Sequence, residues 1–174
     1  MATIIATPGA SDANSYPTLV EADAYHDTRG HNTAWTSADD ATKISHLIWA
    51  TRVLEDNFIW YSDQKTEEQA LHWPAFSGFY KSGYAIPDTI VPQMVKDAQS
   101  ELAFLLIEND LTVADDPIVP GVKKAKIDTL SFEADKTDRQ SMLPDSVLVL
   151  IQWLGKFEGA GTSTSNGTFR TFRS

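Results

Sequence analysis

Hydrophobic side chains recur at three- and four-residue spacing in four segments of the chain, and this period predicts four α-helices. The second and third segments are the longest, and each carries one apolar stripe wide enough to be buried along a whole helix face. The predicted helices span residues 18–27, 37–57, 87–108 and 145–154. The expected fold class is therefore mainly α, a small bundle of about four helices.

Local signals set the expected ends of these helices. Thr18 and Glu21 have the spacing of a capping box, in which each side chain bonds the other residue's backbone N–H. Pro87 suits the first turn of the third helix, where no N–H is needed, and Pro92 lies only slightly further in. Gly155 is expected to stop the last helix.

Two further segments lack the helical period. Residues 58–85 read as irregular and hold eight aromatic residues, whereas residues 122–133 partly alternate and predict an extended or strand-like segment. A length of 174 residues suits one domain. We expect an N-terminal arm over residues 1–16, a helical domain over residues 17–156 and a flexible C-terminal tail over residues 157–174.

The aromatic segment has two interpretations. It is either a loop that covers the core or a surface that a neighbouring subunit covers, because Trp, Tyr and Phe dominate the centres of protein interfaces. The candidate subunit-interface residues are Trp60, Tyr61, Trp73, Phe76, Phe79 and Tyr80.

The tail ends in alternating aromatic and basic residues after a spacer rich in Gly, Ser and Thr. This pattern is typical of a peptide that docks on a partner, with Phe filling pockets and Arg pairing with acidic groups, although a disordered terminus is the alternative. The candidate docking residues are Phe169, Arg170, Thr171, Phe172 and Arg173.

Charge separates the body of the chain from its last third. The chain has 14 Lys and Arg against 24 Asp and Glu, a net charge of −10, and the excess of acid lies before residue 117. An acidic body argues against tight, sequence-independent DNA binding, which depends on Lys and Arg neutralising phosphates. It remains compatible with a surface along which DNA slides. The longest apolar run is only a few residues, so no membrane span is expected.

Candidate catalytic groups are scarce. The chain has no cysteine, no phosphate-binding loop and no zinc-protease or nucleophile-elbow motif. Asp23, His26 and His31 are the best metal-like cluster, but a solvated helix end is the more ordinary interpretation. We therefore expect no enzyme activity, no metal and no cofactor.

The order of several motifs resembles a family of tailed-bacteriophage proteins. These motifs are Trp60, the turn Gln69-Ala-Leu-His-Trp-Pro74, the pair Ile86-Pro87 and the helix segment Glu101-Leu-Ala-Phe-Leu-Leu106. Over residues 15–155 they resemble the head–tail adaptor, or head-completion, proteins, some of whose relatives are labelled DnaT-like single-stranded-DNA-binding proteins. Relatives often carry Arg directly after the Trp-Pro pair, where this chain has Ala75.

The resemblance implies a structural role in the neck of a virion that is assembled in the host cytoplasm. Such adaptors form a ring, typically twelvefold, under the portal protein. The ring extends the channel for genome DNA, without sequence-specific binding, and receives the next neck or tail protein. C-terminal extensions commonly reach the portal, which would give residues 169–173 a portal-docking role. The alternative function is binding of single-stranded nucleic acid through exposed aromatic side chains.

Overall fold

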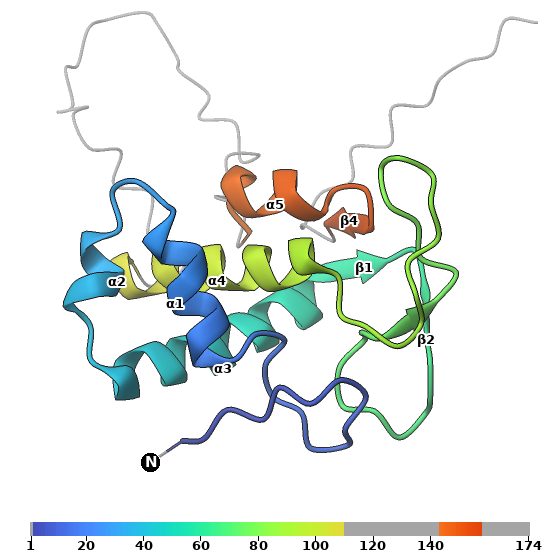
Figure 1. The fold of residues 1–174 in the computed structure, drawn as a ribbon, viewed down its shortest axis with the longest axis horizontal. Coiled ribbons are helices and arrows are strands. Elements are labelled where there is room, and N and C mark those ends of the chain that lie inside the picture. Colours follow the sequence, from blue (N-terminus) through green and yellow to red (C-terminus); the bar gives the residue numbers. More distant parts are fainter. Residues whose placement is uncertain (1, 110–142, 158–174) are drawn as a thin grey trace, which may run out of the picture.

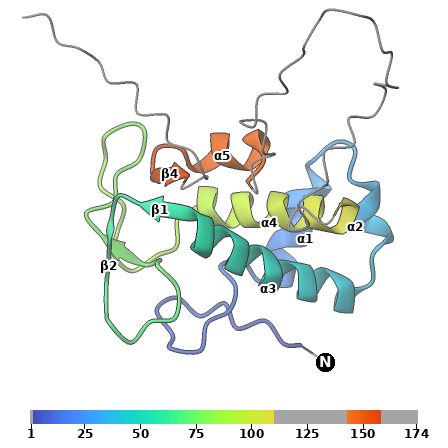
Figure 2. The same cartoon turned by 180° about the vertical axis from the view of Figure 1, so that it is seen from behind.

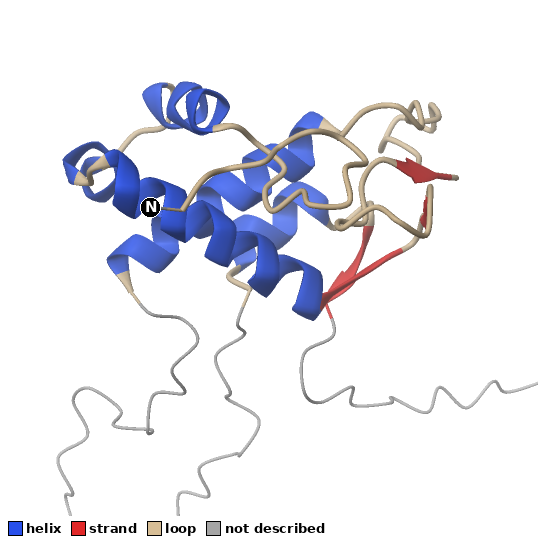
Figure 3. Ribbon diagram, turned by 90° about the horizontal axis from the view of Figure 1, so that it is seen from below, coloured by secondary structure: helices blue, strands red, loops and turns tan. Residues whose placement is uncertain are grey.

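The computed structural model describes residues 2–109 and 143–157, which contain five helices and four short strands (Figure 1). The helices are α1 (Leu19–Asp27), α2 (Thr33–Ser37), α3 (Asp40–Asn57), α4 (Gln93–Glu108) and α5 (Asp145–Ile151). The strands are β1 (Phe58–Trp60), β2 (Asp63–Gln64), β3 (Ala75–Phe76) and β4 (Gly155–Phe157). The helices gather at one side of the domain, and the strands lie with the loops at the other (Figure 3).

The central element is α4, which packs against each of the other four helices. It lies between α5 and α3 in both views of the ribbon (Figures 1 and 2). Most of its circumference is buried, and Val95, Ala98, Leu102 and Ala103 are fully inaccessible, as expected for a helix that is apolar on several faces. In the described part of the chain, no helix combines the length and the apolar character that crossing a membrane requires.

The predicted start of α1 is confirmed, whereas α3 begins at Asp40, three residues after its predicted start, because Ser37 is the last residue of the separate helix α2. Thr18 Oγ1 accepts a hydrogen bond from Glu21 N at 3.2 Å, and the Glu21 carboxylate accepts one from Thr18 N at 2.8 Å. Asp39 caps α3 by accepting a hydrogen bond from Thr42 N at 2.8 Å. The helix ends at Asn57, as its apolar period predicts.

The third helix begins six residues later than predicted. Pro92 is the N-cap of α4, with extended backbone angles of φ −60° and ψ 140°. A proline has no N–H to give to a helix, and it pushes the residue before it out of the helical region. The stretch from Pro87 to Val91 therefore forms turns, and the helix starts at Gln93.

The strands revise the prediction that residues 58–85 are irregular, and they make the fold mixed α/β rather than purely helical. Strand β1 pairs antiparallel with β4, and β2 pairs with β3. With two or three residues each, these strands are too short to show an alternating pattern. The last helix ends at Ile151, and Gly155 opens a strand instead of stopping that helix. The predicted strand over residues 122–133 lies outside the described residues.

The N-terminal segment joins the core through Gln99, a fully buried polar residue of α4. Its Oε1 accepts a hydrogen bond from Tyr16 N at 2.9 Å, and its Nε2 donates to Ser15 Oγ at 2.7 Å and to the Leu47 carbonyl at 3.0 Å. One amide thus connects the arm, α3 and α4.

Gly155→Ala is predicted to destabilise the domain. A Cβ at this position would lie 2.2 Å from the Ile59 carbonyl oxygen and 2.4 Å from Phe58 Cε1, so the β1–β4 pair must open. We expect a loss of about 1–3 kcal/mol in the free energy of unfolding, measured by urea titration. Gly30→Ala is the matched control, since a Cβ there meets no atom within 4 Å. Equal stability of the two variants would contradict this packing.

Candidate interaction surface

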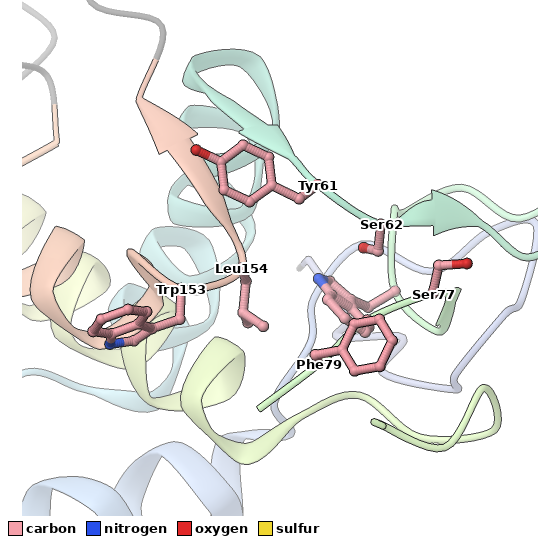
Figure 4. A pocket seen from close by; sticks show the side chains of 8 residues that line it. Tyr61, Ser62, Ser77, Phe79, Trp153 and Leu154 are labelled. Carbon is pink, nitrogen blue, oxygen red and sulfur yellow. The ribbon is translucent and has the colours of Figure 1, made fainter. Parts of the chain in front are cut away.

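A shallow hollow with partly aromatic walls lies where the β1–β4 pair, α5 and the loop after β3 meet (Figure 4). Its volume is about 70 Å³. The lining residues, called here the aromatic hollow, are Tyr61, Ser62, Trp73, Ser77, Gly78, Phe79, Trp153 and Leu154. Trp153 and Phe79 stand on opposite sides of Leu154 (Figure 4).

Backbone pairing brings these side chains together from distant parts of the sequence. Tyr61 N donates to the Leu154 carbonyl at 2.8 Å, which extends the β1–β4 pair to the wall of the hollow. On the other side, Phe79 pairs with Ala85 across a tight loop, and Ile86 N donates to the Gly78 carbonyl at 2.8 Å. Both walls are therefore held by backbone hydrogen bonds.

Trp73 lines the hollow from inside the core, where it is 1% exposed. Gly78 permits this packing, because a Cβ at Gly78 would lie 2.7 Å from Trp73 Cη2. The indole Nε1–H of Trp73 is buried and has no hydrogen-bond acceptor in the described residues. Trp73 therefore forms a buried aromatic part of the lining, and its unpaired N–H lies beneath the surface.

The rim of the hollow is exposed. Tyr61 is 65% exposed, Phe79 55% and Trp153 51%. The Lys81 ammonium lies 5.0 Å from the Trp153 ring centroid, within cation–π range. Phe76 and Tyr84, from the same aromatic segment, and Val149, four residues before Trp153, are also exposed.

The predicted interface candidates divide into three groups. Tyr61, Phe76 and Phe79 are exposed, whereas Trp60 and Tyr80 are half-buried against the core. Trp73 is buried within the domain and is therefore not accessible to a neighbouring subunit. Trp153 was not among the candidates. The sequence feature that could have identified Trp153 is its four-residue spacing from Val149. This spacing places two large apolar side chains on the outer side of the last helical segment.

The other candidate residues do not contribute to this surface. Residues 169–173 lie outside the described residues. Asp23 accepts hydrogen bonds from Trp35 Nε1 at 2.8 Å and from Lys43 Nζ at 2.9 Å. His26 stacks on Trp35, and its Nε2 lies 3.1 Å from the Ser100 carbonyl. These contacts tie α1 to α2, α3 and α4.

The proposed metal-like cluster is not brought together. The described ranges contain no group of three His, Asp or Glu side chains that could hold a metal, and His31 is an exposed residue with a φ of 57°.

A partly buried carboxylate, Glu55, connects several segments that lead to the hollow. Glu55 Oε1 accepts hydrogen bonds from Tyr16 Oη at 2.6 Å and from Trp60 Nε1 at 3.3 Å, and its Oε2 accepts one from His72 N at 3.1 Å. Burial raises the pKa of Glu55 despite these three donors, and it raises the pKa of Tyr16 well above the ordinary value. This role cannot be predicted from the hydrophobic pattern, because Glu55 lies off the apolar stripe of its helix.

His72 completes the packing between this network and the hollow. Its ring stacks on Trp60 with a centroid distance of 5.5 Å, and its Nε2 lies 2.9 Å from Ser62 Oγ. Burial disfavours the imidazolium ion and lowers the pKa of His72 to about 4. The neutral ring is therefore the form that fits between Trp60 and Ser62.

Most basic side chains of the body already have carboxylate partners. Ion pairs join Arg29 to Glu101, Lys43 to Asp23, Lys65 to Asp88 and Lys96 to Glu21. Among the described residues, Arg52, Lys81 and Lys156 are the Lys and Arg side chains outside these pairs. The body thus offers little positive charge to a phosphate backbone.

His72 is predicted to make the domain less stable as the pH falls from about 6.5 to about 4. In this window the unfolded chain binds a proton that the folded chain excludes, so the free energy of unfolding decreases as the pH falls. His72→Gln should flatten this dependence, measured by urea titration at several pH values. Ser62→Ala keeps the imidazole and should retain the slope. An unchanged slope in His72→Gln would refute the assignment.

Comparison with known proteins gives one family. The chain matches no curated protein and no solved structure. Residues 1–173 match the family described as "Putative DnaT-like ssDNA binding protein". Since this match spans nearly the whole sequence, the chain belongs to the family of DnaT-like ssDNA-binding proteins.

Proposed function

We propose that this protein is a structural head–tail adaptor of a phage neck, which forms a ring below the portal protein and provides a platform for the next neck or tail protein. The observation that carries the proposal is an exposed aromatic surface on an acidic body. Tyr61, Phe79 and Trp153 are each more than half exposed around one hollow.

Exposed aromatic side chains in this number favour a protein partner. Large apolar patches on soluble domains mark interaction sites, and Trp, Tyr and Phe contribute most to the centres of protein interfaces. Copies in a closed ring meet through two different patches, one on each neighbour. The aromatic hollow supplies one such patch, and Phe76 and Tyr84 from the same aromatic segment are exposed as well.

The charge of the body supports a passage rather than a binding site for DNA. Four of its basic side chains are held in ion pairs, and carboxylates exceed basic residues in the whole chain by 24 to 14. A negative wall repels phosphates at range, so DNA would move past it without being retained. The motif order that resembles phage adaptors points to the same role.

Single-stranded DNA binding is the second candidate, and two observations favour it. The family description names ssDNA, and Lys81 lies over Trp153 beside Tyr61 and Phe79. Bases stack on such aromatic faces when basic side chains track the backbone. The surrounding acidic charge opposes this function.

Deletion of residues 158–174 is expected to abolish association with the portal protein and to leave the fold intact, because the described domain ends at Phe157. Native mass spectrometry of the protein mixed with its portal measures the ring, and circular dichroism checks the fold. The full-length chain should give a closed ring on the portal. If the truncated chain assembles on the portal equally well, the docking role of the tail is wrong.

The two functions predict opposite results with an oligonucleotide. An adaptor should show no appreciable binding of fluorescent oligo-dT by anisotropy at physiological salt. A single-stranded-DNA-binding protein should bind it with an affinity that falls as salt rises, and Trp153→Ala should weaken binding more than Trp49→Ala, which alters an exposed Trp on α3. Tight binding of this kind would replace the adaptor proposal.

A further inference from the structure

We propose that in the isolated protein the aromatic hollow is occupied by the C-terminal segment of the same chain, residues 169–173. The inference goes beyond the adaptor function and needs no portal or tail protein. It identifies an autoinhibitory contact that covers the exposed aromatic surface before assembly.

The hollow has the size and chemistry for one apolar side chain. Its volume of about 70 Å³ is far below the roughly 300–1,000 Å³ of small-molecule pockets. Half of its eight lining residues are aromatic, and a Phe ring packs favourably edge-to-face against such residues.

The chain leaves the described domain beside the hollow. Leu154 lines the hollow, and the described residues end three positions later at Phe157, in β4 next to α5 (Figure 1). Residues 158–168, rich in Gly, Ser and Thr, then precede Phe169. A coil of that composition and length has an end-to-end distance of about 18 Å, which is a short return path.

This short connection favours the same chain over a second copy. A segment joined to its site by about eleven residues acts at an effective concentration of about a millimolar, well above the micromolar concentrations of a purified protein. Charge offers one acidic partner, Asp63, against one like charge at the rim, Lys81 over Trp153. Arg170 and Arg173 are basic, while Asp63, directly after Ser62 of the hollow, is exposed and outside the four ion pairs of the described residues.

Occupation of the hollow would have a consequence for assembly. Tyr61, Phe79 and Trp153 would be shielded while the protein is alone, so that copies do not associate prematurely. A partner that captures the segment would expose the aromatic surface at the place where the next subunit is needed.

A spin label tests the contact in the full-length chain. The native chain has no cysteine, so Ser174→Cys gives a single attachment site at the end of the segment. The label should broaden the indole N–H signal of Trp153 much more strongly than that of Trp49 in ¹⁵N NMR spectra. Both indoles belong to exposed residues, and Trp49 lies on α3, on the other side of α4 from α5.

The control variants separate the possible occupants. Phe169→Ala with Phe172→Ala should remove the selective broadening of Trp153, whereas Thr162→Ala with Thr164→Ala should retain it. Equal effects on Trp153 and Trp49 in the labelled parent would overturn the proposal. So would selective broadening of ¹⁵N protein by a labelled, unenriched copy, because that result assigns the hollow to a second chain. None of these measurements involves the portal, so failure here leaves the adaptor proposal standing, and failure of portal docking leaves this contact standing.

Discussion

The hydrogen bonds to the Glu55 carboxylate hold together the part of the domain on which the proposed function depends. They connect the N-terminal segment through Tyr16, strand β1 through Trp60 and the loop before β3 through His72. Removing a carboxylate even partly from water is costly unless its lone pairs are satisfied, and here three donors converge on Glu55. Replacing any donor leaves charge uncompensated, so the three segments stay in one arrangement.

The shape of the aromatic hollow depends on how Glu55 holds these three segments. The His72 backbone N–H donates a hydrogen bond to Glu55, which fixes the position of His72. The next residue, Trp73, lines the hollow from the core. The Tyr16 hydroxyl also accepts a hydrogen bond from Trp73 N at 3.3 Å. The exposed rim formed by Tyr61, Phe79 and Trp153 thus sits on a rigid support, and rigid aromatic anchors lose little entropy when a partner covers them.

The sequence predicts the long elements of this protein and misses the polar contacts that organise them. The apolar period finds α1, α3, α4 and α5, because each buries one or more faces. It misses α2 and the four strands, which are shorter than the patterns that identify them. A helical period also gives no signal for Gln99, a polar residue that hydrogen bonds hold inside the core, or for Glu55, which is partly buried. Aromatic composition alone does not show that Trp73 is buried and Tyr61 is exposed. This difference in exposure arises from the tertiary structure, including the pairing of β1 with β4.

The central claim is that the aromatic surface is buried between protein chains in an assembled ring. Cryo-electron microscopy of the protein bound to its portal tests it most directly. The account predicts a closed ring in which Tyr61, Phe79 and Trp153 of each copy lie against a neighbouring chain. A ring in which all three side chains face solvent, or a complex in which they stack on the bases of single-stranded DNA, would contradict it.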